Sequence, residues 1–529
     1  MSREYDNEDS LQKRIMAGVN ILADNVGSTL GPKGRNVLLK EKGGAPFITK
    51  DGVTVAHFVS LADEFANAGA EIIRQAAIET NNSAGDGTTT STVLARAILR
   101  ESQRYITSGV SPIEIQRGIQ AAVKEVVKNL IEMSRPVHTV EEITHVAAIS
   151  ANNDKSIGRL ISTAVDKVGQ DGAITIEESR SLETSLDVME GYRMRAGYCA
   201  GAFITDERRG LMQYDEPMFL VTDHKITMIE QILPILELAA REARPLIIVC
   251  EDIEGQALAA MIMNAVRGTM KVAAIKAPAY GEERRNILED LAASTSAQFL
   301  TRASGKKLQQ TLLTDLGTAK TIESTKHVTT IIGGNCDYNA IEKKIEFLKA
   351  QVIDTENIEE ASSIQQRIAR LASGVAVIRV GGATAVEVTE KKHRIEDALE
   401  AVRSAQEEGI VPGGGCALLR ASQTMAIVTR DGDDHPDQIT GALIVKNACT
   451  EPIKQMALNA GVSSDLIIDS LLRESKENVW NFRGGEMVDC YESGIIDPLK
   501  VTVSALQNAA SCASTLITTN FGIIQTEDK

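Results

Sequence analysis

The sequence predicts a mainly α-helical protein with an α/β part in the middle of the chain. Two observations lead to this prediction. Apolar residues recur at spacings of three and four over long stretches near both ends, which is typical of amphipathic helices. Short and almost continuous apolar runs occur in the middle, which is typical of buried strands. The length of 529 residues corresponds to three or four domains of ordinary size.

Four helices are predicted in the first quarter of the chain. Their approximate ranges are residues 10–26, 61–80, 88–106 and 111–133. The last of them has Ser111 at the cap position and Pro112 just inside, where a missing N–H costs nothing. From Arg394 onward the sequence again predicts mostly helices, one of them over residues 416–422.

The strands are predicted at residues 245–250, 271–276 and 375–380, each of which is a short apolar run. A helix over residues 257–266 separates the first two, as expected for an α/β unit. A pair of charged helices is predicted within residues 338–372, with a break near Asp354. Tandem repeats, low-complexity segments and long linkers are absent from the sequence.

Composition excludes several classes of protein. Hydrophobic residues make up 43% of the chain and aromatic residues only 3%, so the core must consist of Ala, Val, Ile, Leu and Met. No apolar run reaches the ~18–20 residues of a membrane span. The net charge of −16 argues against nucleic-acid binding. The seven cysteines and seven histidines are scattered, which argues against a zinc site. The acidic N-terminal sequence lacks a signal region, so a cytoplasmic location is expected.

Two glycine-rich segments near the N-terminus have the chemistry of phosphate binding. One is the run from Thr29 to Arg35, and the other is Gly85-Asp-Gly-Thr-Thr-Thr90 directly before a predicted helix. Glycine lets the backbone approach an anion, and a helix N-terminus offers free N–H groups. Asp86 adds a carboxylate suited to Mg²⁺. Asp51 is a further acid in a predicted turn, Lys50-Asp-Gly52.

Each of these pieces has an ordinary structural explanation. Gly-Asp-Gly is commonly a turn, and threonines at a helix start are commonly caps. The P-loop pattern Gly-x-x-x-x-Gly-Lys-Ser/Thr is absent. A second set of candidates lies far away, with Asp397 on a predicted helix, a Gly413-Gly-Gly415 loop, and Asp497 in a predicted turn. Taken together, the two sets favour a phosphate site.

The same motifs closely resemble those of group I chaperonins, the GroEL type. Thr-Leu-Gly-Pro-Lys-Gly-Arg-Asn, Lys-Asp-Gly-Val-Thr-Val-Ala, Gly-Asp-Gly-Thr-Thr-Thr, Glu-Asp-Ala-Leu and Gly-Ile-Val-Pro-Gly-Gly-Gly follow one another here, and the resemblance extends from about residue 10 to residue 523. It implies a ring-forming, three-domain chaperonin fold. The equatorial ATPase domain would comprise residues 1–132 and 408–529, the intermediate domain 133–189 and 376–407, and the α/β apical domain 190–375.

The resemblance also implies an ATP site with Mg²⁺ and K⁺. Asp397 would orient and deprotonate the attacking water, assisted by Asp51. Asp86 would hold Mg²⁺, and the carbonyls of Thr29 and Lys50 would bind K⁺. The remaining nucleotide contacts would come from Leu30, Gly31, Pro32, Lys33, Gly87, Thr88, Thr89, Thr90, Gly414, Asn481, Phe482 and Asp497.

A polypeptide-binding surface follows from the same resemblance. Its residues would be Tyr198, Phe203, Leu233, Leu236, Leu258, Ile262 and Met263, although each stretch read alone is an amphipathic helix burying one face. The surface would bind unfolded polypeptides and a GroES-type lid. Seven subunits would form a ring. Gly191 and Gly374 match the upper hinge of the family, and Pro136 and Gly409 match the lower hinge.

The sequence departs from the family at several positions. Ala196 and Ala385 replace an Arg and a Glu that pair between neighbouring subunits, so we expect weaker ATP cooperativity. Val462 and Ser463 replace an acidic pair at the contact between rings, and Pro436 replaces another acid. A single ring, or a weakly paired double ring, is therefore a possibility alongside the usual double ring.

The predicted function is an ATP-driven chaperonin that binds, encloses and releases non-native polypeptides. One alternative is a ring-forming relative with a specialised or non-folding role, which the intact set of Asp51, Asp86 and Asp397 does not exclude. A second alternative is a small-molecule ATP-dependent enzyme. Such an enzyme needs a second pocket with acid–base groups, and the sequence offers no His- or Lys-based constellation for one.

Overall fold

A computed structural model describes residues 2–40, 46–169, 173–179, 181–207, 209–336, 338–354, 364–365, 367–368, 370–371, 374–426 and 435–526. The chain forms two compact units. The helical unit consists of Met1–Thr163 and Gly382–Lys529, and the sheet unit consists of Ala164–Gly381. Both chain ends therefore contribute to one unit, as expected if the middle of the chain is an insertion.

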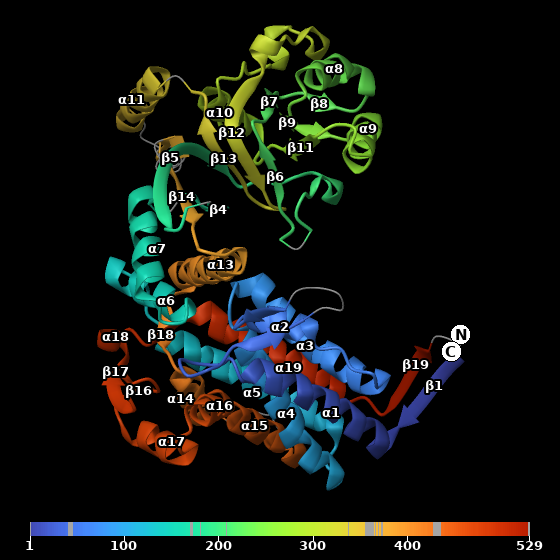
Figure 1. The fold of residues 1–529 in the computed structure, drawn as a ribbon, viewed down its shortest axis with the longest axis vertical. Coiled ribbons are helices and arrows are strands. Elements are labelled where there is room, and N and C mark those ends of the chain that lie inside the picture. The colour runs from blue at the N-terminus through green and yellow to red at the C-terminus, as the bar shows by residue number, and fades with distance from the viewer. Residues whose placement is uncertain are drawn as a thin grey trace. The chain divides into compact units, whose positions relative to one another are not determined.

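Six helices of the helical unit (Figure 1) supply most of the aliphatic side chains of its core. These helices are α1 (Glu8–Gly27), α3 (Glu64–Ala84), α4 (Thr88–Thr107), α5 (Pro112–Met133), α15 (Pro436–Ala448) and α19 (Leu499–Ile517). The four helices predicted in the first quarter of the chain are confirmed, each to within about one turn. Phe65 is the one aromatic residue buried in this core among the residues that the structure describes, which agrees with the low aromatic content.

Small residues allow the core helices to approach closely. A Cβ atom on Gly441 in α15 would lie 2.8 Å from the Cα of Gly118 in α5, and one on Gly118 would lie 2.1 Å from the carbonyl oxygen of Gln438. The two helices thus touch backbone to backbone, and any larger residue would force them apart.

The other helices of this unit are α2 (Gly52–Phe58), α6 (Val140–Ser150), α13 (Ala385–Glu408), α14 (Cys416–Gln423), α16 (Glu451–Ala460), α17 (Ser464–Arg473) and α18 (Cys490–Ser493). Among the described helices, α13 is the longest, with 24 residues. Helix α7 (Lys155–Val168) starts in the helical unit and ends in the sheet unit. Helix α13 begins nine residues before Arg394, the point from which the sequence predicts helices, because its first half is charged and lacks a clear apolar stripe.

Four two-stranded sheets in the helical unit escape prediction, because runs of three to six residues are too short for periodicity to appear. They pair β1 (Ser2–Asn7) with β19 (Phe521–Thr526), β2 (Val37–Leu39) with β3 (Phe47–Thr49), β15 (Ile410–Pro412) with β18 (Ile496–Pro498), and β16 (Asn478–Asn481) with β17 (Glu486–Asp489). The β15–β18 pair matters for the site, because it brings the triple-glycine loop beside Asp497.

The sheet unit contains a nine-stranded mixed sheet (Figure 1). Its strands lie in the order β11 (Val272–Lys276), β9 (Leu246–Cys250), β7 (Met218–Val221), β12 (Gly317–Ser324), β13 (Thr329–Gly334), β5 (Ser185–Met194), β14 (Gly374–Val380) and β4 (Ala173–Glu178), with β6 (Met212–Asp215) also on β12. Strands β7, β9 and β11 are parallel and almost entirely buried. The three predicted strands are therefore confirmed as β9, β11 and β14.

Helices complete the α/β part of the sheet unit. Helix α8 (Leu233–Glu242) separates β7 from β9 in the sequence, and α9 (Gly255–Val266) separates β9 from β11. Helix α10 (Gly281–Thr295) follows β11, and α11 (Tyr338–Asp354) is the first member of the predicted charged pair. Most of the second member, including residues 355–363, lies outside the described residues.

Candidate functional site

A cavity of about 460 Å³ lies within the helical unit. Segments from both ends of the chain form its wall. They include residues 29–32, 49–52 and 85–90 from the first hundred residues, and parts of α13, the triple-glycine loop, the β16–β17 turn and β18 from the last part. The two sets of motifs, more than three hundred residues apart in the sequence, are therefore brought together.

The N-terminus of α4 forms one side of the cavity. Gly87 is the N-cap with φ of +87°, in the left-handed region that favours glycine. A Cβ atom there would also lie 2.7 Å from Val501 Cγ1. Thr88, Thr89 and Thr90 follow in the first turn and line the cavity. Free N–H groups, the helix dipole and hydroxyl donors make this end of α4 suited to an anion.

The loop that contains Gly31 is tied to this helix terminus. The hydroxyls of Thr29 and Thr89 lie 3.4 Å apart, and Lys50 Nζ donates to the carbonyl oxygen of Gly31 at 3.0 Å. Burial lowers the pKa of Lys50, and the nearby Arg394 lowers it further. A partly buried cation beside Arg394 adds to the anion-binding character of the wall.

Asp51 has a different local structure from the predicted turn. It is the N-cap of α2, and its two carboxylate oxygens accept hydrogen bonds from the N–H groups of Val53 and Thr54, both at 3.0 Å. These bonds fix the carboxylate in the cavity wall. Asp51 is therefore held in place before any ligand binds.

Among the described residues, five carboxylates line the cavity: Glu390 and Asp397 belong to α13, and the other three are Asp51, Asp86 and Asp497. Burial raises the pKa of Asp86, opposed by hydrogen bonds from the Gly87 N–H at 2.5 Å and from Ser150 Oγ at 2.9 Å; the carboxylate of Asp51 raises it further. Burial, together with the charge of Asp86, raises the pKa of Asp497 to about 7. Such mutual repulsion is relieved by a cation.

The donor set fits Mg²⁺ but does not complete its coordination. Among the described residues, no group of three or more His, Cys, Asp or Glu side chains is arranged to hold a metal. Mg²⁺ is usually bound by one or two carboxylates together with phosphate oxygens and water. Asp86 beside an anion-binding helix terminus matches that pattern.

The raised pKa of Asp497 predicts a pH-dependent stability. In the unfolded chain this carboxyl has a pKa near 3.8, so between about pH 4 and pH 7 the folded protein retains a proton that the unfolded chain releases. The resulting stabilisation is fully present below pH 4 and is lost as the pH rises through 7. The side chain of Asp497→Asn cannot ionise, so the variant should lose less stability than wild type between pH 4 and pH 7. The two losses in free energy of unfolding should differ by on the order of 1–2 kcal/mol.

Thermal unfolding of the nucleotide-free protein between pH 4.5 and 8 measures this difference. The exposed Asp465, in the first turn of α17, provides the matched control Asp465→Asn. Parallel pH profiles for wild type and Asp497→Asn would contradict the assignment of a buried, raised-pKa carboxyl at this position.

The structure brings together almost all residues that the sequence placed at a nucleotide site. Those lining the cavity are Thr29, Leu30, Gly31, Pro32, Lys50, Asp51, Asp86, Gly87, Thr88, Thr89, Thr90, Asp397, Gly414, Asn481, Phe482 and Asp497. Lys33 differs, because it is exposed and does not belong to the wall. Its loop turns at Gly31 and Gly34, which directs the neighbouring residues toward solvent.

Other lining residues were missed by the sequence reasoning. They include Asn152, Asn153, Lys155, His393, Arg394, Trp480 and Arg483. Asn152 and Asn153 have φ of 59° and 63°, so two successive residues adopt the left-handed conformation between α6 and α7. Asparagine tolerates this conformation better than most residues, and the Asn-Asn-Asp sequence was a usable signal. Spacing from Asp397 was the signal for His393 and Arg394.

The expected apolar surface of the sheet unit is partly present. Leu233 in α8 is 45% exposed and Met263 in α9 is 50% exposed. Tyr198, Leu258 and Ile262 are half-buried at the edge of the core.

Two residues expected on this surface, Phe203 and Leu236, are instead core residues, with 1% and 5% exposure. Leu236 lies on the face of α8 that also carries the buried Ile235 and Ala239. Phe203 ends a short 3₁₀ segment, η1 (Gly201–Phe203), that packs against α9. Exposed apolar residues that the prediction missed are Met228, Val266, Leu312 and Leu313.

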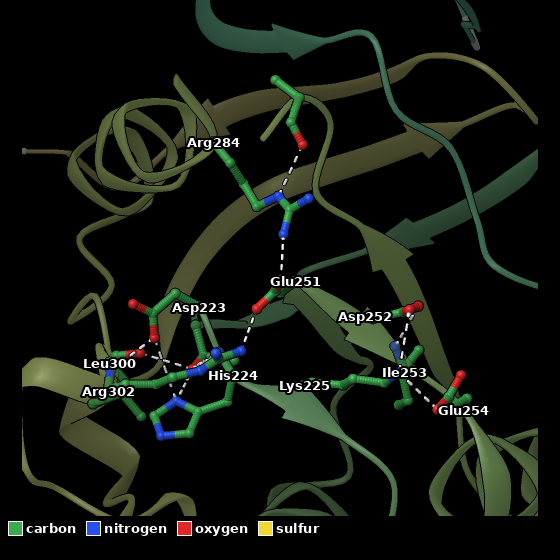
Figure 2. Close-up of polar contacts among 12 residues, drawn as sticks. Asp223, His224, Lys225, Glu251, Asp252, Ile253, Glu254, Arg284, Leu300 and Arg302 are labelled. Carbon is green, nitrogen blue, oxygen red and sulfur yellow. Dashed lines mark hydrogen bonds and ion pairs between the residues drawn. The ribbon is translucent and has the colours of Figure 1, made fainter. Parts of the chain in front are cut away.

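A second concentration of charged groups lies at the carboxyl ends of β7 and β9 (Figure 2). Glu251 forms ion pairs with Arg302 and with Arg284, the latter at 2.7 Å. Lys225 pairs with Glu254 at 2.8 Å, directly before α9. Because the carboxylates and cations are paired with one another, this cluster does not resemble a second catalytic pocket.

Cys416 lies next to the triple-glycine loop, and burial raises the pKa of its thiol to about 11. This cysteine is therefore unsuited to act as a nucleophile. No helix in the described part of the chain is both long and apolar enough to cross a membrane.

Comparisons with known proteins agree with this arrangement. The chain resembles crystal structures of the chaperonin gp146 from the bacteriophage EL 2 (Pseudomonas aeruginosa), obtained in the presence of ATP-BeFx. Crystal form II matches with a TM-score of 0.68 and crystal form I with 0.63, each at 23% identity over 99% of both chains. This likeness confirms the chaperonin fold. The model of the TCP-1/cpn60 chaperonin family matches residues 22–527, and the chain therefore belongs to that family.

Proposed function

We propose that this chain is the ATP-hydrolysing subunit of a ring chaperonin, which binds non-native polypeptides on the apolar surface of its sheet unit, encloses them and releases them for folding. The observation that carries the proposal is the cavity of the helical unit. There a helix N-terminus suited to phosphate lies in the same wall as the carboxylates of Asp51, Asp86, Asp397 and Asp497. The chaperonin gp146 structures, obtained in the presence of ATP-BeFx, support nucleotide as the ligand.

The residues of the cavity have separate roles in the proposed reaction. The first turn of α4 and the loop at Gly31 would bind the phosphates, and Asp86 would hold Mg²⁺, which neutralises charge that develops on the transferred phosphoryl group. Thr29 and Lys50 would supply carbonyls for K⁺. Asp397 would orient the attacking water and accept its proton, assisted by Asp51. Gly414, Asn481, Phe482 and Asp497 would position the nucleoside.

The proposed assembly is a seven-membered ring that works in the cytoplasm with a GroES-type lid. Residues 1–132 with 408–529, 133–189 with 376–407, and 190–375 would be its equatorial, intermediate and apical domains. Whether one or two rings form would depend on the region of Val462, where an exposed apolar side chain replaces an acid. The exposed Leu458 and Leu466 lie four positions before and after it in the sequence. We expect rings that pair weakly. A ring with a specialised client is the second candidate function. It is favoured by the burial of Phe203 and Leu236, two residues expected on the apolar surface.

Polypeptide binding is tested by the variant Leu233→Ser/Met263→Ser. Its affinity for a chemically unfolded polypeptide should fall at least about tenfold, because burial of one large apolar side chain contributes about 1.5–3 kcal/mol. Its ATP turnover should remain unchanged, since neither residue belongs to the helical unit. Fluorescence anisotropy with a labelled unfolded protein gives the affinity.

The control is Phe347→Ser in α11, which removes an even more exposed apolar side chain, 62% exposed, elsewhere in the sheet unit. Equal losses in the control and in the double variant would assign binding to general hydrophobicity. No loss in either would remove the apolar surface from the proposed function.

A further inference from the structure

Helix α13 presents four titratable or charged side chains to the cavity: Glu390, His393, Arg394 and Asp397. Their spacings of three, one and three residues place them along one face of the helix, roughly two turns long. Asp397 is the residue proposed to activate water. His393 lies one turn before it, at the i−4 position, and is half-buried.

The charged neighbours on this face already have partners. Arg394 forms an ion pair with Glu390, and its Nη1 lies 3.6 Å from Asp154 Oδ2 at the α6–α7 junction. These contacts hold Arg394 along the edge of the helix face. His393 lies on the same face and lines the cavity, and the proposed hydrolytic cycle assigns it no role.

The other charged groups that line the cavity come from several elements. Lys50 and Asp51 precede α2, Asp86 precedes α4, Lys155 begins α7, Arg483 lies in the β16–β17 turn, and Asp497 lies in β18. Of the elements packed against α13, β18 contributes Asp497, whereas α3, α6 and α19 contribute only uncharged side chains to the wall in the described residues.

We propose that His393 is a positioning residue for the terminal phosphate of the bound nucleotide, its imidazolium donating a hydrogen bond to a phosphoryl oxygen beside the water held by Asp397. This inference rests on the proposed ATPase function. Imidazole suits this place, because its ordinary pKa of about 6.5 lets a nearby phosphate shift it to the charged form at neutral pH. A donor next to the base restrains the phosphate relative to the attacking water.

The proposal predicts that ATP binds more tightly when the imidazole is protonated. The KM for ATP should rise roughly threefold to tenfold between pH 6 and pH 8 in the wild type, since a pKa shift of up to one unit changes affinity up to tenfold. His393→Gln keeps a hydrogen-bonding side chain of similar size but cannot titrate. Its KM should stay at the high-pH wild-type value throughout, with kcat at pH 8 within about twofold of wild type.

The test is steady-state ATP hydrolysis from pH 6 to 8 by wild type, His393→Gln, Asp497→Asn and the control Lys392→Gln. Lys392 lies on the same helix but outside the cavity wall. Because the ionisation of ATP itself affects all four proteins equally, only differences between them count. Asp497→Asn separates the titration of that carboxyl from the titration of His393.

The expected result is a pH-dependent KM in wild type and Lys392→Gln that is lost in His393→Gln. The same pH dependence in His393→Gln as in wild type would overturn the role of His393 while leaving the ATPase proposal intact. An absence of nucleotide binding and hydrolysis in the wild type at every pH would overturn both.

Discussion

Replacing Asp397 by alanine should lower ATP turnover by at least about a hundredfold while nucleotide affinity stays within a few fold of wild type. A positioned general base typically contributes 10²–10⁴-fold to a rate. The other parts of the phosphate site, α4 and the loops at Gly31 and Lys50, lie on separate elements and remain intact. The variant should therefore bind ATP and retain it. Single-turnover hydrolysis and equilibrium nucleotide binding, measured side by side, check both halves of the prediction.

The control for this variant is Glu408→Gln, which removes an exposed carboxylate at the end of the same helix, away from the cavity. Its turnover should match wild type. If Asp397→Ala loses affinity and rate together, Asp397 contributes to binding rather than to the chemical step. If it loses neither, another group activates the water.

Replacing Asp86 by asparagine should have opposite effects on activity and on stability. The variant should lose Mg²⁺-dependent ATP binding and most hydrolysis, because it lacks the carboxylate proposed to hold the metal. The nucleotide-free protein should become more stable, by on the order of 1–3 kcal/mol at pH 8. Asparagine keeps one acceptor oxygen for the Gly87 N–H, and its amide NH2 can donate to the Ser150 hydroxyl, but it no longer repels Asp51 and Asp497.

Thermal unfolding with and without Mg²⁺–ATP measures both effects. The unfolding temperature of wild type should rise when Mg²⁺–ATP is added. Without nucleotide, Asp86→Asn should unfold at a higher temperature than wild type, and adding Mg²⁺–ATP should raise that temperature little. The control Asp465→Asn should behave as wild type. If Asp86 is repelled by its neighbouring carboxylates, the protein gives up stability at this position in order to bind the metal. A nucleotide-free Asp86→Asn protein that is less stable than wild type would contradict this explanation.

The parts of the fold that the sequence predicts are those with long, regular patterns. Helices such as α4 and α5 repeat their apolar stripe over several turns, and β9 and β11 are continuous apolar runs between polar segments. The paired short strands depend on contacts between distant parts of the chain, as with β15 and β18, and periodicity does not record such contacts. The strand pairing of the sheet unit, including the two partners of β12, is likewise a long-range property.

The candidate site was predictable where glycine and acidic residues are required by chemistry. Gly87 needs a left-handed backbone and Asp86 a short carboxylate at a helix start, and both appear in the sequence as a motif. Side-chain direction was less predictable. Lys33 points away from the cavity, and Phe203 enters the core, because neighbouring backbone geometry and packing decide these outcomes. His393 was overlooked because its one-turn spacing from Asp397 becomes informative only once the helix face is known.

The most direct test of the central claim is the release of bound polypeptide by nucleotide. A labelled, chemically denatured enzyme is first bound to the nucleotide-free protein, Mg²⁺–ATP is then added, and release and recovered enzyme activity are followed together, with Asp397→Ala in parallel. We expect wild type to bind the denatured enzyme, to release it on ATP addition and to turn over repeatedly, and Asp397→Ala to complete at most one cycle. A denatured enzyme that does not bind, or whose binding is unaffected by Mg²⁺–ATP, would contradict the proposed function.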